Sequence, residues 1–166
     1  MTGHCSSSKT GLDAYQCLVK GKLNEGPAEL PQVQEKKLFE LSNKNSMKEF
    51  SKASKIVRNG FIMYSKACKK VQKRNSFTIR TSGNTVVEVH YYLMDNTSRH
   101  VYAVCTKLDT TCAVIERRVP HIRQARTVQD VELHIMKAED LQQLVVNFKV
   151  NDQQFVAFIP NTIERD

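Results

Sequence analysis

Residues 46–63, SMKEFSKASKIVRNGFIM, decide how the N-terminal half of the chain is interpreted. Ser46 and Glu49 have the spacing of a capping box, which predicts that a helix begins there. On a helical projection the basic residues share one arc of about 120°. This arc holds Lys44, Lys48, Lys52, Lys55 and Arg58, and the opposite side holds Met47, Phe50, Ala53, Ile56 and Val57.

The segment after Asn59-Gly60 repeats the same construction. One projected face holds Lys66, Lys69, Lys70 and Lys73, and the other holds Phe61, Tyr64, Ala67, Cys68 and Val71. Asn59-Gly60 would then supply the left-handed stop between two basic helices. The same dipeptide between apolar runs is also a strong signal for a β-hairpin over 56–64. We favour two helices because the lysine spacing fits a period of 3.6 better than 2, and the hairpin is the alternative.

Two segments precede this stretch. The first 33 residues carry Ser6-Ser7-Ser8 and the prolines Pro27 and Pro31 without a clear apolar period, which predicts a flexible arm. From Gln34 the spacing of Leu38 and its neighbours Phe39 and Leu41 predicts a short helix that ends in the polar cluster 42–45.

Beyond Asn75 the apolar pattern changes to a period of two. Candidate strands cover 76–81, 84–94, 100–107, 111–119, 129–136, 142–150 and 153–159, and they are rich in Val, Thr, Tyr, Phe and Ile. Their short connections predict antiparallel pairing, because parallel strands need long crossovers. Residues 138–147 also fit a helix, and this alternative stays open.

The fold that we expect is α+β. N-terminal basic amphipathic helices would pack on an antiparallel β-sheet of five to seven strands arranged as a meander. The expected division is an arm over 1–33 and a single domain over 34–166, helical over 34–74 and β-rich over 75–160. A chain of 166 residues is long enough to bury one core without disulfides or metal.

Charge is distributed unevenly along the chain. Residues 1–83 hold sixteen Lys or Arg against six acids, whereas residues 84–166 hold nine against eleven. Within 44–80 the only acid is Glu49, against eleven basic residues. A surface of one sign at this density attracts polyanions, although lysines also commonly solvate the outer face of a helix.

We therefore expect a non-enzymatic binding protein that engages nucleic acid, either DNA or RNA, through a basic helical face. A second group of arginines flanks Pro120 and can extend the same surface. The predicted binding residues are Lys44, Lys48, Lys52, Lys55, Arg58, Lys66, Lys69, Lys70, Lys73, Arg74, Arg80, Arg117, Arg118, Arg123 and Arg126. The alternative is a protein–protein adaptor or a subunit of a complex, in which the sheet or the apolar helix face meets an acidic partner.

Five cysteines without a Cys-x-x-Cys pair fit neither a disulfide framework nor a zinc finger, so reduced thiols and no metal are expected. A zinc set built from His100, Cys105, Cys112 and His121, with His90 or His134 as substitutes, has no familiar spacing. Cys68 lies among lysines, which favours a reactive thiol, but its apolar projected face favours a packed one.

Signatures of catalysis are not found in the sequence. It has no phosphate-binding glycine loop, no Gly-x-Ser-x-Gly and no His-Glu-x-x-His. Glu88 with His90, and Glu132 with His134, are spaced for acid–base pairs, but alternation on a half-solvated strand produces such pairs anyway. We expect no enzyme, no cofactor and no membrane span. We also expect a location in the cytosol or nucleus, outside the secretory route, and residues 69–74 resemble a basic nuclear-import signal.

Overall fold

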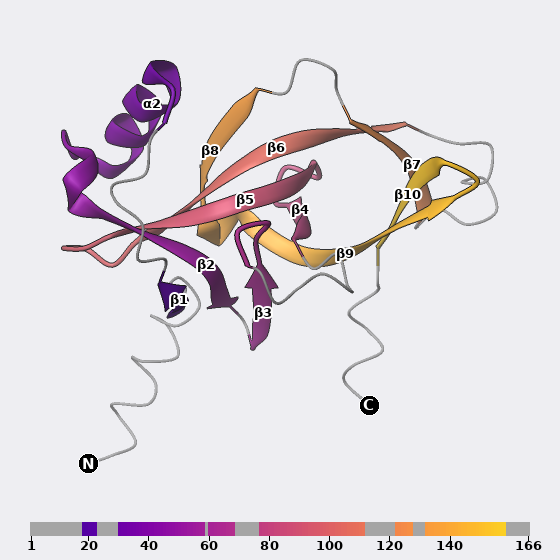
Figure 1. Ribbon diagram of the computed structural model, residues 1–166, viewed down its shortest axis with the longest axis horizontal. Helices are drawn as coiled ribbons and strands as arrows, with labels where there is room; N and C mark the ends of the chain where they lie inside the picture. Colours follow the sequence, from indigo (N-terminus) through magenta and orange to yellow (C-terminus); the bar gives the residue numbers. More distant parts are fainter. Residues whose placement is uncertain are drawn as a thin grey trace, which may run out of the picture.

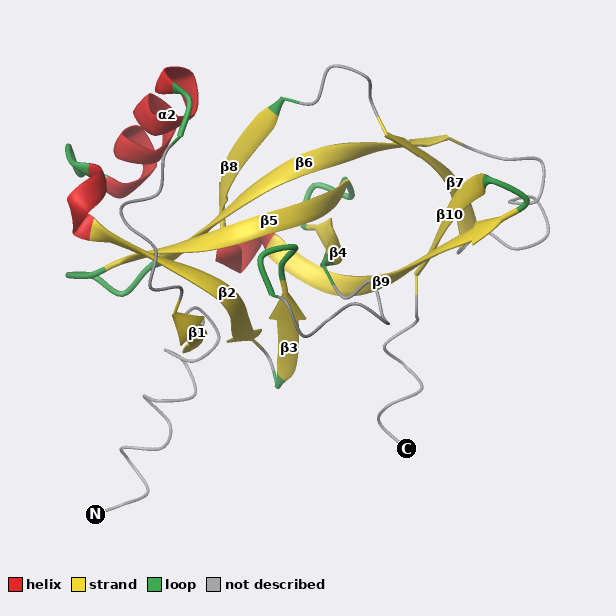
Figure 2. Cartoon of the chain, in the orientation of Figure 1, coloured by secondary structure: helices red, strands yellow, loops and turns green. Residues whose placement is uncertain are grey.

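The computed structural model describes residues 18–22, 30–58, 60–68, 77–111, 122–127 and 132–158. Within these ranges the protein has one α-helix and ten strands, and every strand pairing is antiparallel (Figures 1 and 2). The helix is α2 (Gln32–Ser42), and two short 3-10 turns are η1 (Met47–Glu49) and η3 (Ala138–Asp140). The strands are β1 (Leu18–Lys22), β2 (Phe50–Arg58), β3 (Phe61–Tyr64), β4 (Thr78–Thr81), β5 (Val86–Asp95), β6 (Val101–Thr111), β7 (Ile122–Thr127), β8 (Leu133–Lys137), β9 (Leu141–Val150) and β10 (Gln153–Phe158).

The prediction of basic helices packed on a five- to seven-stranded sheet is wrong. The stretch expected to form the first basic helix is instead strand β2. Of the second stretch the structure describes only 61–68, which form strand β3 and a turn. The helical period arose because Ala53 and Ile56, three positions apart, are both buried in the same core cluster. Strict alternation therefore fails across 53–56, and a strand imitates the spacing of a helix.

The capping signal at Ser46 forms, but no α-helix follows it. The Ser46 hydroxyl accepts a hydrogen bond from the Lys48 backbone N–H at 3.3 Å, and η1 lasts only three residues. At Phe50 the chain becomes extended and pairs with β5, placing Phe50 opposite Asp95. Pairing with a distant strand therefore overrides the local preference for a helix.

The hairpin alternative over 56–64 is confirmed. Ile56 lies opposite Met63 and Arg58 opposite Phe61, which leaves a two-residue connection. Gly60 has φ +79, the left-handed conformation that such tight hairpins require. Residues 138–147 also take the strand alternative, because only η3 is helical there.

Most of the predicted elements beyond Asn75 are present, and so is the first helix. The helix α2 ends at Asn43 in the left-handed conformation, as the polar cluster after Leu41 predicted. β1 and β7 were not predicted, and the strand expected at 111–119 lies largely outside the described residues. β1 belongs to the expected flexible arm, and it pairs with β2. The division into an arm and one domain stays a prediction.

Six strands close into a ring through their pairings. β5 pairs with β4 and β6, β4 with β9, β9 with β10, β10 with β7, and β7 with β6. Figure 1 shows these strands curving around one another, with β2 leading away from the ring beside β5. Strand β6 is long enough to pair with β7 near one end and with β8 near the other.

Three clusters of buried residues fill this architecture. The central cluster is Ala53, Ile56, Met63, Ile79, Val87, Val89, Tyr92, Met94, Val101, Ala103, Cys105, Ala138 and Leu141. The helix-side cluster, Leu38, Phe50, Leu93, Tyr102, Val104 and Ile135, joins α2 to the opposite face of β5 and β6. The ring cluster is Val86, Leu108, Ala125, Val145, Val156 and Phe158. Because it draws on five strands of the ring, this cluster marks the ring's interior.

No helix in the described part of the chain is both long and apolar enough to cross a lipid bilayer.

Candidate functional site

The predicted binding residues that the structure describes lie on several different elements. Lys52 and Lys55 lie on β2, which pairs with β3 and β5, and Lys66 follows β3 and is hydrogen-bonded to β5. Arg80 and Arg123 lie on strands of the ring, and Arg126 is exposed on β7. Six of the predicted residues lie outside the described residues: Lys69, Lys70, Lys73, Arg74, Arg117 and Arg118. Within the described residues, strands β2 and β3 stand where the basic helices were expected, so Lys52, Lys55 and Lys66 do not share a helical face.

Lys52 and Lys55 point away from the central cluster. Ala53 lies opposite Tyr92, and both residues are in that cluster, so the neighbouring Lys52 points to the other side of the sheet. The pair Ile56 and Met63 is buried in the same way. Lys55 and its partner Tyr64 therefore also point outward. Both lysines are partly exposed.

Each of these lysines lies over an aromatic ring. The Lys52 amine is 4.5 Å from the centroid of the Tyr91 ring, and the Lys55 amine is 5.9 Å from that of Tyr64. Lys66 adds a third pair, because its amine is 5.5 Å from the centroid of Phe77. All three aromatic side chains are partly exposed. We call these six residues the lysine–aromatic surface.

Backbone hydrogen bonds attach the third pair to β5. The Lys66 N–H donates to the Val89 carbonyl at 2.9 Å, and the Val89 N–H donates to the Phe77 carbonyl at 2.9 Å. Tyr91 is two residues further along the same strand. The three lysine–aromatic pairs are thus built on β2, β3 and β5 and on the segments bonded to β5.

Glu88 and His90, which the sequence spaces for an acid–base pair, take other partners. The Glu88 carboxylate is 3.5 Å from the Lys66 amine, and His90 Nε2 is 3.1 Å from the Thr106 hydroxyl. Burial lowers the pKa of His90, and the positive charge of Lys66 lowers it further. His90 is therefore neutral at pH 7, and Glu88 partly balances the charge of Lys66.

Arg58 and Lys44 are less available than the lysines on β2. Arg58 is only 9% exposed, and within the described structure its Nε and Nη1 make no hydrogen bond. The Lys44 amine lies 3.8 Å from Asp95 and 3.9 Å from Glu49. Its charge is therefore largely compensated, and Lys48 lies in the neighbouring turn η1.

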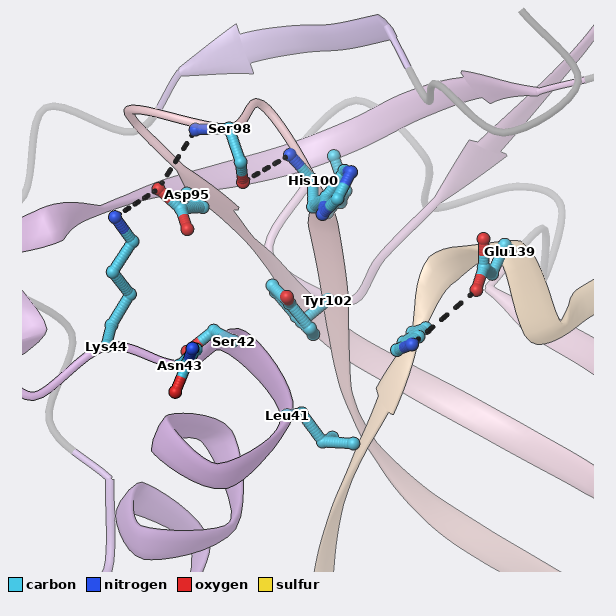
Figure 3. Close-up of a pocket in the computed structure, with 11 residues that line it drawn as sticks. Leu41, Ser42, Asn43, Lys44, Asp95, Ser98, His100, Tyr102 and Glu139 are labelled. Carbon is cyan, nitrogen blue, oxygen red and sulfur yellow. Dashed lines mark hydrogen bonds and ion pairs between the residues drawn. The ribbon is translucent and has the colours of Figure 1, made fainter. Parts of the chain in front are cut away.

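A separate pocket of about 490 Å³ lies beside the C-terminal end of α2 (Figure 3). Its size is that of a small-molecule site. The end of α2, the β5–β6 turn and the junction of β8 with η3 form its walls. They contribute Leu41, Ser42, Asn43, Lys44, Asp95, Ser98, His100, Val101, Tyr102, Lys137 and Glu139.

Asp95 is the best-supported charge in this pocket. Its carboxylate accepts hydrogen bonds from the backbone N–H of Thr97 at 2.9 Å and of Ser98 at 3.3 Å. Burial raises the pKa of Asp95, but these hydrogen bonds and the nearby Lys44 outweigh it, so the net shift is downward. Asp95 is therefore ionised at neutral pH.

The other groups of the pocket are balanced or neutral. Burial raises the pKa of Tyr102, and the charges of Asp95 and Glu139 add to the effect, so Tyr102 is an uncharged phenol at pH 7. The Lys137 amine is 3.9 Å from Glu139. The pocket can thus hydrogen-bond a small polar molecule. No motif in the sequence pointed to these residues, so this pocket was missed.

The imagined zinc set is not assembled in the described structure. Cys105 is buried and its thiol lies 3.6 Å from the His134 carbonyl, whereas His100 lines the pocket and Cys112 and His121 lie outside the described residues. Burial raises the pKa of Cys105 to about 12, which makes it a poor metal ligand. Among the described residues no three His, Cys, Asp or Glu side chains are grouped to hold a metal.

Comparison of the chain with protein-family models, with curated proteins and with solved structures found no match.

Proposed function

We propose that this is a non-enzymatic binding protein that engages nucleic acid through the lysine–aromatic surface. The observation that supports it is that three lysine amines each lie over a partly exposed aromatic ring on β2, β3 and β5 or on segments bonded to β5. Lysines neutralise phosphates, and aromatic faces stack with unpaired bases of any sequence. This combination favours a single strand over a duplex, because duplex bases are already stacked.

The net charge of +8 supports the same proposal at longer range, since a basic protein accelerates its encounter with a polyanion. Lys66 contributes less than Lys52 or Lys55 while it pairs with Glu88. When a phosphate replaces Glu88 as its partner, the amine can leave the Phe77 ring and expose it for stacking.

A salt titration tests the proposal. The affinity for labelled single strands of about 12 nucleotides, DNA and RNA, is measured by fluorescence anisotropy from about 50 to 200 mM salt. The parent should bind with an affinity that falls linearly on a log–log plot. The variant with glutamine at Lys52, Lys55 and Lys66 should lose about one unit of slope per lost phosphate contact.

The matched control changes the same number of charges elsewhere. Glutamine at the exposed Lys36, Lys37 and Lys149 leaves the lysine–aromatic surface intact. This control should retain most of the parent's slope and affinity. Equal losses of affinity in both triple variants would show that binding depends only on net charge and not on the lysine–aromatic surface. A parent that binds no single strand would contradict the proposal.

A second candidate is a protein–protein adaptor that docks through the β2–β3 hairpin. Phe61 is 44% exposed and Ile62 is 41% exposed, so two neighbouring large apolar side chains at the start of β3 are accessible to a partner. Under this alternative, replacing Phe61 and Ile62 with serine abolishes association with a protein partner. The lysine-to-glutamine variant then has the weaker effect, so the two variants distinguish the two functions.

A further inference from the structure

A pair of arginines inside the six-stranded ring forms a second basic region. Arg80 of β4 lies opposite Val86, Arg123 of β7 lies opposite Val156, and Phe158 of β10 lies opposite Val145. All three valines belong to the ring cluster. Directly opposed residues point to the same side of a sheet, so both arginines point into the ring.

Both guanidinium groups contact the same aromatic ring. Their central carbons lie 5.3 Å (Arg80) and 5.0 Å (Arg123) from the centroid of Phe158. Within the described part of the chain, neither arginine forms an ion pair with an acidic side chain. Two like charges therefore gather at one aromatic ring, and no acidic side chain among the described residues pairs with either of them.

Arg80 also has an unused donor. Its Nε atom is buried and makes no hydrogen bond within the described structure. A buried donor without an acceptor is unfavourable, and most such groups in folded proteins have a partner. Both arginine side chains are nevertheless partly exposed, so a small ligand can reach them from solvent.

We propose that Arg80 and Arg123 form a binding site for a single phosphate group, with Phe158 holding the two guanidinium groups in place. A tetrahedral oxyanion supplies the acceptors that Arg80 lacks and balances both charges. The planar donor fork of arginine matches the geometry of phosphate oxygens. This site is distinct from the lysine–aromatic surface, because its residues lie on β4, β7 and β10 and not on β2, β3 and β5.

The phosphate group can come from the free ion or from a phosphate ester. Calorimetric titration with inorganic phosphate, with adenosine monophosphate and with adenosine separates these sources. We expect one phosphate per chain, and no binding of adenosine. Tighter binding of the monophosphate than of inorganic phosphate would identify an ester as the ligand, and the reverse order would identify the free ion.

Matched variants test the residues. Arg80→Gln and Arg123→Gln should each weaken phosphate binding at least tenfold. Arg126→Gln removes the same charge from the same strand as Arg123, but its side chain is exposed on the other face, and binding should stay within twofold of the parent. A parent that binds no phosphate, or an equal loss in Arg126→Gln, would overturn the site.

A purely structural role predicts a different result for stability. If the arginines serve only to pack on Phe158, glutamine at either position lowers the melting temperature, and phosphate does not raise that of the parent. Under the proposal, phosphate raises the melting temperature of the parent but not that of either variant. If a glutamine variant does not fold, the lysine variant at the same position tests the site instead. Lysine keeps the positive charge but lacks the donor fork of arginine, so this variant should still lose most of the affinity for phosphate.

Discussion

The lysine–aromatic surface and the arginine pair of the ring use the same interaction in two different settings. Lys52, Lys55 and Lys66 each lie over a separate aromatic ring on β2, β3 and β5 or on segments bonded to β5. Arg80 and Arg123 lie over Phe158 on the inner side of the ring, where a donor is left without a partner. Lys52 and Arg80 both point away from the central cluster, so the neighbouring strands and aromatic rings, and not the density of charge in the sequence, determine what a basic residue can bind.

The largest effect is expected from removing the aromatic side chain of Phe158, which both arginines contact. Phe158 is 9% exposed and belongs to the ring cluster, so Phe158→Ala should lower the free energy of unfolding by about 3–5 kcal/mol. Urea denaturation measures this change. Phosphate binding should be lost, whereas the affinity for a single strand should remain wherever the variant is folded. A loss below about 1 kcal/mol would place Phe158 outside the core.

The pocket beside α2 differs from the arginine pair, because its charged side chains lie close to opposite charges. Asp95→Asn should cost about 1.5–3 kcal/mol at pH 7, the contribution of hydrogen bonds to a charged group. The pKa of Asp95 is lowered in the folded state, so its contribution is present above the unfolded pKa of about 3.9 and is lost as the pH falls through the folded pKa.

The measurement for Asp95 is the unfolding free energy of parent and variant at several pH values. The difference between them should be largest at neutral pH and should shrink below about pH 4. Single-strand and phosphate binding should not change. A difference independent of pH would show that the Asp95 charge does not stabilise the turn.

Tyr64 tests whether the outer surface binds bases as well as phosphates. Tyr64→Ala should weaken single-strand binding by about 1–3 kcal/mol, the usual contribution of one stacked base. Tyr64→Phe keeps the ring, and the backbone carbonyl that accepts the Tyr92 hydroxyl is unchanged in both variants. If alanine and phenylalanine give equal affinities by anisotropy, the surface binds phosphates alone.

The smallest effect is expected from a label at the edge of this surface. Cys68 is partly exposed and two residues from Lys66, whereas Cys105 is buried with a pKa raised to about 12. Iodoacetate should modify Cys68 and spare Cys105 in the folded protein, as read by peptide mass mapping. The added carboxylate near Lys66 should weaken single-strand binding a few-fold and leave phosphate binding unchanged. Modification of Cys105 at a similar rate would contradict its burial.

Local signals in the sequence were sufficient for several elements. The left-handed Asn43 after Leu41 ends α2 where expected, and Asn59-Gly60 joins β2 to β3 as the hairpin alternative required. The tight β9–β10 connection at Asn151 and Asp152, both with positive φ, was also recognisable from its residue types. These features depend on a few neighbouring residues, so one sequence can reveal them.

The interpretation failed where distant pairing decides the structure. Ser46 signalled a helix, but Phe50 and the residues after it pair with β5 about forty positions away, a contact that no local pattern encodes. The prediction of a single basic binding face was wrong for the same reason. The sequence located the basic residues, but whether Lys52 points outward or Arg123 inward depends on register with other strands, and one position of register reverses the face.

Mapping the nucleic-acid contact residue by residue tests binding through the lysine–aromatic surface most directly. The protein labelled with ¹⁵N is titrated with an unlabelled single strand, and the amide signals are followed by NMR. We predict that the largest shifts occur at Lys52, Lys55, Tyr64, Lys66 and Tyr91, with small changes on β9 and β10. No shifts at saturating oligonucleotide, or the largest shifts elsewhere than β2, β3 and β5, would contradict binding through the lysine–aromatic surface.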